Sequence, residues 1–351
     1  MRIPESRGPL SSALFAVLAQ APDGAGTELD GLHRLAAAQV AGTGDIIGDE
    51  DIQLTLFCLY ELHYSGLDGV SDDWEWEPAL IRVRQLIERP FEAALRTAAQ
   101  QAAGDVELPT GVAMTSDQVA DVLFGLAATD TGPSVSRYVA RKATLEQLRE
   151  FLIHKSVYQL KEADPHTWAI PRLSGRPKAA LVEIQADEYG GGRPDRMHSA
   201  LFARTMRGLG LDDSYGAYLD AVPAVSLASV NLMSLCGLNR RLRGAITGHL
   251  AIYEMTSSQP NRFYGNGFRR HGFGTDVTHY FDEHVEADAV HEQIAGRDLA
   301  GGLVEAEPEL LADVLFGATA VMAIDNRLSA HLMTSWEAGT SSLRAAVPAA
   351  A

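Results

Sequence analysis

The sequence predicts an all-α protein, and three observations support this fold class. Ala, Leu, Glu, Gln and Arg dominate the segments in which apolar residues recur at helical spacing, and these residues favour helices. The sequence has no runs that alternate β-branched with polar residues, the pattern expected of strands. The breaks between periodic segments are clusters of Gly and Pro that do not form hairpin signals. Because no motif recurs at a fixed period, we expect a helical bundle rather than a solenoid.

The N-terminal part of the chain predicts an arm followed by a helical extension. Residues 1–45 carry scattered Gly and Pro among apolar positions, which predicts an arm with at most one short helix. Residues 46–131 predict the extension. Its first helix begins near Asp49, where acidic residues suit the positive end of a helix dipole.

Two more helices are expected in the extension. Apolar residues at i, i+3 and i+4 predict a helix over residues 80–95. Pro90 should kink this helix or start a new one, because proline cannot donate the helical hydrogen bond. A break at residues 104–111 then separates it from a helix over residues 116–128.

Residues 132–345 predict the main helical bundle. Helical signals are nearly continuous from Ser134 onward and are interrupted by Gly and Pro clusters, including one at Pro260. The last long helix is expected from Glu307 to about Glu337, with one broad apolar face that closes the bundle. The final residues, 345–351, predict a frayed tail.

Composition excludes several classes of protein. The 351 residues include 46 acidic and 29 basic side chains, giving a net charge of −17, which argues against nucleic-acid binding. With 46% hydrophobic residues the chain has enough apolar side chains for a sizeable core. No run approaches the roughly 18 to 20 apolar residues of a membrane helix, so no membrane association is expected.

Cysteine usage points to a reducing compartment. Cys58 and Cys236 lie far apart with no CxxC spacing, which argues against a disulfide framework or a thiolate zinc site. The apolar stretch at residues 10–19 is interrupted by two serines and is followed by no convincing processing site. We therefore expect a cytoplasmic protein.

The most informative segment is the predicted helix over residues 276–293. His284, Asp288 and His291 stand at i, i+4 and i+7, so on a helix they span roughly 60° of one face. Two imidazoles and a carboxylate on one face suit Fe, Mn or Zn. The alternative is a solvated acidic face, in which His279 and Glu283 offer a competing alignment.

Further acidic residues occur in apolar helical surroundings, where an unpaired carboxylate is costly to bury. Glu162 closes one predicted helix, and Glu254 lies within another. Glu188 ends a third, and His198 lies just inside the next, for which Asp195 is the expected cap. Each acid alone is best explained as a surface residue, but together with the histidines they form the donor set of a di-iron carboxylate site.

This pattern resembles the heme-oxygenase-like di-iron oxidases and oxygenases, often described as iron-containing redox enzymes. The family signature is a Glu on the first core helix, a Glu followed by a His, a further Glu, and a His-x3-Asp-x2-His run. This chain has a matching residue for each part, at intervals of 26, 10, 56, 30, 4 and 3 residues between about Ser134 and Trp336: Glu162, Glu188, His198, Glu254, His284, Asp288 and His291.

The resemblance implies a heme-oxygenase-like up-and-down helical bundle with an N-terminal helical extension. It implies two Fe(II) ions per chain held by the seven residues, with O2 as co-substrate and no catalytic residue beyond the ligands. The reaction would be N-oxygenation, hydroxylation, desaturation or C–C cleavage of a small amine, amino acid or fatty acid in natural-product biosynthesis. An external electron donor and a homodimer are also expected.

Two other functions stay open at this stage. One is a non-catalytic all-α binding or interaction protein, whose acids and histidines form a solvated face. The other is a haem-binding protein, although several inward carboxylates would repel a dianionic porphyrin. Within the di-iron alternative, Glu188 is expected to be the optional ligand, because it ends its helix against three glycines and can swing with that break.

Two further motifs are interpreted as structural. Glu61 and His63 are two residues apart, which on a helix turns their side chains about 200° away from each other. The run from Gly265 to Phe268 resembles a dinucleotide fingerprint only superficially, because no strand precedes it. We expect this run to be a loop near the mouth of the site.

Overall fold

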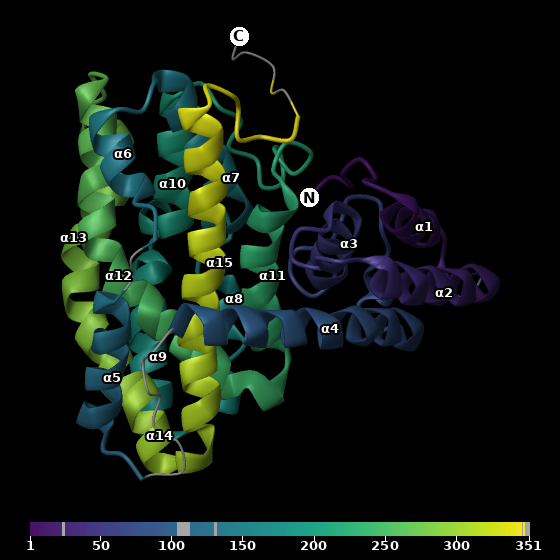
Figure 1. The fold of residues 1–351 in the computed structure, drawn as a ribbon, viewed down its shortest axis with the longest axis horizontal. Helices are drawn as coiled ribbons and strands as arrows, with labels where there is room; N and C mark the ends of the chain where they lie inside the picture. The colour runs from purple at the N-terminus through teal and green to yellow at the C-terminus, as the bar shows by residue number, and fades with distance from the viewer. Residues whose placement is uncertain (23–24, 104–112, 130–131, 346, 348–351) are drawn as a thin grey trace.

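The computed structural model describes residues 1–22, 25–103, 113–129, 132–345 and 347, and within them all regular secondary structure is helical. This confirms the all-α prediction. A tall bundle stands beside a smaller group of N-terminal helices, and a long helix, α4, reaches from one to the other (Figure 1). In the described part of the chain, no helix is long and apolar enough to cross a membrane.

The first 103 residues form more helix than the sequence predicted. The segment expected to be an arm contains two helices whose leucines, such as Leu14 and Leu32, are buried. On each helix the buried leucines recur at helical spacing and form one buried face. The prediction of at most one short helix is therefore wrong. The helices of this part are α1 (Pro9–Leu18), α2 (Gly26–Gly42), α3 (Glu50–Glu61), the short η2 (Asp72–Trp74) and α4 (Pro78–Ala103).

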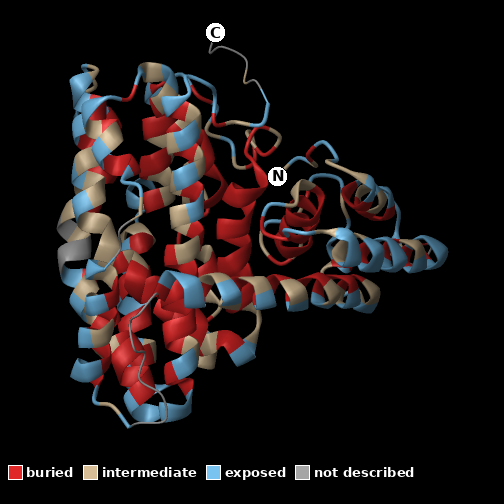
Figure 2. Cartoon of the chain, in the orientation of Figure 1, coloured by how far each residue is buried: buried red, intermediate tan, exposed pale blue. Residues whose placement is uncertain are grey.

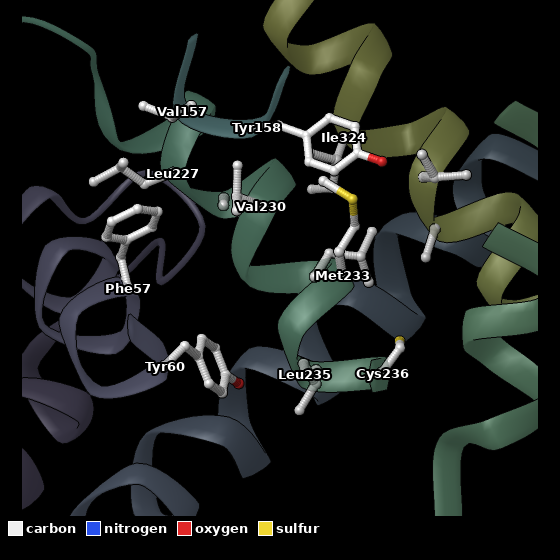
Figure 3. Packing of buried hydrophobic residues seen from close by; sticks show 14 of the residues in the cluster. Phe57, Tyr60, Val157, Tyr158, Leu227, Val230, Met233, Leu235, Cys236 and Ile324 are labelled. Carbon is white, nitrogen blue, oxygen red and sulfur yellow. The ribbon is translucent and has the colours of Figure 1, made fainter. Parts of the chain in front are cut away.

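Helix α3 attaches this group to the bundle. Asp49 caps it by accepting from the backbone N–H groups of Asp51 and Ile52, as its acidic start suggested. Every residue of α3 after Glu50 is buried. Figure 3 shows Phe57 of α3 beside Leu227 of α11, so the N-terminal helices share one hydrophobic core with the bundle.

The bundle contains the remaining elements, and most of their buried residues face its interior (Figure 2). Its α-helices are α5 (Ser116–Ala128), α6 (Val135–Arg141), α7 (Leu145–Gln159), α8 (Asp164–Thr167), α9 (Gly175–Glu188), α10 (His198–Gly208), α11 (Ala224–Leu238), α12 (Arg243–Arg270), α13 (Thr275–Gln293), α14 (Gly302–Ala306) and α15 (Leu311–Glu337). A π-helix, η7 (Ile294–Gly301), continues α13. Short 3₁₀ turns are η3 (Ile170–Arg172), η4 (Gly190–Gly192), η5 (Pro194–Arg196), η6 (Arg240–Leu242) and η8 (Pro308–Leu310).

Two prolines that predicted breaks lie inside continuous helices. Pro90 lies within α4 and Pro260 within α12. Each proline removes one backbone hydrogen bond, but α4 packs on α2 and α15, and α12 packs on α13 and α15, along their lengths. Both helices continue through their prolines, so the predicted break at Pro260 is wrong and Pro90 does not start a new helix.

The glycine run near residue 265 is helical rather than a loop at the site mouth. It lies in the last turns of α12, where a Cβ on Gly267 would stand 2.6 Å from a side-chain carbon of Val139. The glycine lets α12 and α6 approach closely, so the loop prediction is wrong. The predicted break at residues 104–111 lies outside the described residues.

Candidate metal centre

Six of the seven predicted ligands converge in two groups inside the bundle. In one, Glu162, Glu188, His198 and His284 place ligand atoms within 4.8 Å of one another, and in the other Glu188, Glu254 and His291 do the same. All six residues are buried. Glu188 belongs to both groups, so they form one continuous cluster.

Asp288 is the seventh predicted ligand. It lies in α13 between His284 and His291, but its side chain is outside the described residues. Its assignment as a ligand therefore stays a prediction.

The reversal between α9 and α10 brings Glu188 and His198 together. Three glycines follow α9, and Gly190 has a φ of +68° at which a Cβ would stand 2.6 Å from the backbone of Arg196. The chain turns back there, and His198 Nδ1 lies 2.9 Å from Glu188 Oε2. The predicted cap of α10 is wrong, because Met197 occupies the N-cap position while Asp195 lies in η5.

Glu162 lies in a tight turn after α7. The next residue, Ala163, has a φ of +77°. This value lies in the left-handed region, which residues other than glycine rarely adopt. The Tyr280 hydroxyl donates to both oxygens of Glu162, at 2.8 and 3.0 Å. Tyr280 therefore orients this carboxylate. Tyr280 was not among the residues predicted from the sequence, although its place one turn before His284 was an available signal.

His284 is held in an orientation that suits metal binding. Its Nδ1 lies 2.7 Å from the carbonyl oxygen of Tyr280, to which it can donate. Its Nε2 points at Glu162, 3.6 Å from Oε1. Metal-bound histidines usually donate their second ring nitrogen to a carbonyl or carboxylate in this way.

His291 has a comparable outer partner. Its Nε2 lies 3.0 Å from Asp187 Oδ2, and its Nδ1 lies 3.5 Å from Glu254 Oε2. Asp187 therefore orients the imidazole of His291, whose Nδ1 faces Glu254. Asp187 was also missed from the sequence, because a partly exposed acid at a helix end looks like an ordinary surface residue.

Unsatisfied nitrogens mark the centre as a cation site. The Nδ1 atoms of His198 and His291 are buried and have no hydrogen bond, although each faces a carboxylate. A buried polar atom without a hydrogen bond is unusual, and a bound cation would account for it here. Three carboxylates and three imidazoles form a donor set that suits Fe, Mn or Zn, so the residues fit iron.

The electrostatics of the centre support this assignment. Burial alone would raise the pKa of Glu188, but the imidazoles of His198, His284 and His291 hold it below its usual range. Burial would lower the pKa of His291, yet Glu254 and Asp187 raise it to about 9. The carboxylates therefore favour protons on His198 and His291, whose pKa values are raised. A divalent cation would displace those protons.

The other acid and histidine pairs considered in the sequence lie outside the candidate metal centre. His279 and Glu283 form a pair at 3.4 Å on the outer face of α13, where the imidazole is 47% exposed. Glu61 and His63 are buried but diverge, as predicted. Glu61 accepts from the Tyr215 hydroxyl at 2.7 Å, whereas His63 lies 2.5 Å from Arg84.

A cavity of about 160 Å³ adjoins the centre. The candidate ligands Glu162, Glu188, Glu254 and His284 form part of its wall. Aromatic side chains of α7, α10, α12 and α13 form much of the rest: Phe151, Tyr158, Phe202, Tyr253, Tyr264, Tyr280 and Phe281. A small molecule in this cavity would lie directly against the metal ligands.

Comparison with known proteins gives two findings. Residues 149–326, about half of the chain, match the profile of a protein family described as iron-containing redox enzyme. A nitrosourea synthase from Streptomyces achromogenes subsp. streptozoticus is 30% identical over 248 residues, which is 69% of this chain. The match covers 51% of that relative, so the chain spans about half its length. All seven predicted ligands fall within the family match.

Proposed function

Since this chain belongs to the family of iron-containing redox enzymes, we propose that it is a non-haem di-iron oxidase or oxygenase. Its substrates would be O2 and a small molecule held in the cavity beside the centre, and its setting would be natural-product biosynthesis. Reducing equivalents would come from an external electron donor. Membership in a redox-enzyme family favours this proposal over a non-catalytic binding protein.

The observation that carries the proposal is the shared position of Glu188. A carboxylate has two oxygens, and this one has ligand atoms of both groups within 4.8 Å. Glu188 would therefore help to hold both metal ions, with Glu162, His198 and His284 at one ion and Glu254 and His291 at the other. This central place differs from the optional role that the sequence suggested for Glu188.

Iron(II) bound by carboxylates and imidazoles keeps open positions and can supply electrons to O2. The protein contributes orientation and proton control around it. Tyr280 donates to Glu162, and burial together with that carboxylate raises the pKa of the Tyr280 hydroxyl well above its ordinary value. The hydroxyl therefore stays protonated and keeps Glu162 in one orientation.

The same residues argue against haem. Three buried carboxylates, Glu162, Glu188 and Glu254, line one cavity, and a dianionic porphyrin beside them would be repelled. Fe(II) and haem are therefore expected to give opposite results when each is added to the metal-free protein.

The test is metal loading under anaerobic conditions. Metal-free protein is titrated with Fe(II), bound iron is counted, and O2 is then added while optical spectra are recorded. We expect two irons per chain and a new absorption band that appears only with O2. Binding of one iron or none, or a Soret band as the only response to haem and iron together, would contradict the proposal.

A further inference from the structure

Two of the candidate ligands belong to segments that are joined by a separate set of hydrogen bonds. Glu162 precedes the short helix α8, and Glu188 ends α9. In the first group of ligands, their carboxylates lie within 4.8 Å of each other. Because like charges repel each other when no metal is bound, other contacts must hold these two segments together.

The turn after Glu162 is strained. Ala163 has a φ of +77° and is the one residue other than glycine with a positive φ in the described part of the chain. Such strain persists only where the surrounding structure holds the residue in place. The carbonyl oxygen of Ala163 begins α8 by accepting from the backbone N–H groups of His166 and Thr167, at 3.1 Å each. The position of this carbonyl therefore fixes how α8 follows Glu162.

Gln185 of α9 reaches this carbonyl. It lies three residues before Glu188, so the two side chains lie on the same side of α9. Its Nε2 donates to the carbonyl oxygen of Ala163 at 2.9 Å and to the Thr167 hydroxyl at 2.6 Å. Gln185 is 3% exposed and lines the same cavity as Glu162 and Glu188. One buried amide therefore joins the turn of Glu162 to the helix of Glu188.

Tyr189, which follows Glu188, makes a second connection between α8 and α9. Its hydroxyl donates to Asp164 Oδ1 at 2.8 Å. Since a phenol has only one hydrogen to donate, the Tyr189 oxygen accepts from the Thr167 hydroxyl, which lies 2.9 Å away. Donation therefore runs in one direction, from the Gln185 amide to the Asp164 carboxylate through two hydroxyls. The loss of either hydroxyl would break this chain of hydrogen bonds.

We propose that Gln185 and Tyr189 are positioning residues of the candidate metal centre, because they hold the turn of Glu162 against the end of α9. Tyr280 orients the Glu162 carboxylate, whereas these residues place its backbone, so that one ion can contact both Glu162 and Glu188. The inference rests on the proposed function, which supplies the ligands. The α8–α9 network consists of the side chains of Asp164, Thr167, Gln185 and Tyr189 and the carbonyl of Ala163.

Iron affinity is the first test of the α8–α9 network. Gln185→Met keeps an unbranched side chain of similar length but donates no hydrogen bond. Anaerobic competition with a chelator, well below the unfolding temperature, should show that Fe(II) affinity falls about tenfold, the low end for outer partners of metal ligands. A purely structural side chain would lower the Tm and leave the affinity of the folded protein unchanged. Equal affinity in the variant and the parent would overturn the inference.

A milder pair of variants keeps the inference testable if Gln185→Met does not fold. Thr167→Val keeps the shape of the side chain but removes the hydroxyl between Gln185 and Tyr189, so Fe(II) affinity should fall severalfold. Thr167→Ser keeps the hydroxyl and should restore the affinity of the parent. Equal Fe(II) affinity in Thr167→Val and Thr167→Ser would mean that the network does not position the ligands.

Tyr189→Phe should have a smaller effect on Fe(II) affinity than Gln185→Met, because Gln185 still holds the carbonyl of Ala163. Tyr138→Phe is the matched control. It removes a hydroxyl that donates to Gln147 at 3.4 Å, away from the cavity, and should bind Fe(II) like the parent. If Tyr189→Phe binds Fe(II) as tightly as this control, the assignment of Tyr189 is wrong.

Crystal structures of the metal-free parent and the metal-free Gln185→Met variant test the inference without iron. In the variant, we expect Ala163 to leave the left-handed region and the Glu162 carboxylate to move away from Glu188. Unchanged positions of Ala163 and Glu162 would overturn the inference.

The outcomes separate this inference from the proposed function. Two irons per chain in the parent, with equal affinity in Gln185→Met, would overturn the inference and leave the di-iron proposal standing. A parent that takes up no iron, together with a displaced Glu162 in the metal-free variant, would support the positioning role of Gln185 and contradict the di-iron proposal.

Discussion

Two neighbouring residues, Lys161 and Glu162, point into two buried charged clusters of opposite character. Lys161 pairs with Glu61 of α3, and its amino group lies 4.2 Å from the centre of the Tyr64 ring. Tyr215 donates to the same Glu61 oxygen at 2.7 Å. Each charge in this cluster has a counter-charge in the chain. The cluster joins the N-terminal helices to the bundle.

The cluster around Glu162 has no such balance. Glu162, Glu188 and Glu254 each have only a histidine within ion-pair distance among the described residues. Two of those histidines also present a buried nitrogen without a hydrogen bond. Buried like charges are costly unless a cation compensates them. The first cluster is therefore complete as folded, whereas the donor set of the second suits an added cation.

The largest effect is expected at Glu188. Since it is shared by both groups, Glu188→Ala should reduce bound iron from two per chain to nearly none, as counted after anaerobic loading. Glu183→Ala, on the exposed face of the same helix, is the control and should keep both irons. If Glu188→Ala keeps one tightly bound iron, Glu188 does not bridge the groups.

The next largest effect separates the two groups. His284 belongs only to the first group and His291 only to the second. Each change to Ala should therefore remove about one iron while circular dichroism stays helical, because losing a ligand leaves no large cavity. Asp288→Ala should also lower iron content if the prediction for its side chain is right. Full loading in both histidine variants would return the assignment to His279.

Changes in the cluster around Lys161 and Glu61 should alter the stability of the protein rather than its iron content. Lys161→Met leaves Glu61 buried without its partner, which should cost about 3–5 kcal/mol in the free energy of unfolding. The loss should be the same with and without Fe(II). The double variant with Glu61→Leu should recover much of it in denaturant titrations. A single variant as stable as the parent would mean that the pair contributes nothing.

A smaller effect is the stabilisation that iron gives to the unbalanced cluster. A ligand that binds only the folded state adds about 2.7 kcal/mol at a hundredfold excess over Kd, so Fe(II) should raise the Tm by a few degrees. Mg(II), which prefers oxygen ligands and keeps its waters, should do less. Two results together would contradict this prediction. Anaerobic melting curves would superimpose with and without Fe(II), and the Glu162→Gln and Glu254→Gln variants would melt like the parent. These acids would then be ordinary acidic residues.

The smallest effect is expected at Asp187, which touches His291 from outside. Asp187→Asn keeps the shape but removes the charge, so iron affinity should fall about tenfold, at the low end for outer partners of metal ligands, because Asp187 is partly exposed. A competition assay with a chelator measures this change. An unchanged affinity would mean that the 3.0 Å contact does not orient the ring.

Much of the centre could be predicted from the sequence because its signals are local. His284 and His291 share a helix face by spacing alone, and the order of Glu162, Glu188, His198 and Glu254 supplied the resemblance. These six residues lie together in the structure, and their role as ligands stays a prediction.

What could not be predicted depends on contacts between distant segments. The shared place of Glu188 needs three other helices and the turn before α10 to be seen together. Tyr280 and Asp187 act only through the residues they touch. Pro90 and Pro260 are tolerated because α4 and α12 pack on neighbouring helices, which stabilises them despite the lost backbone hydrogen bonds. Local propensity carries no information about any of these contacts.

We infer that two cations complete the unbalanced cluster around a shared Glu188. The most direct test is a crystal structure of anaerobically Fe(II)-loaded protein, with anomalous diffraction recorded at the iron edge. We expect two anomalous peaks, one among Glu162, His198 and His284 and the other between Glu254 and His291, with Glu188 contacting both. A single peak, peaks outside these residues, or a Glu188 side chain that touches neither ion would contradict it.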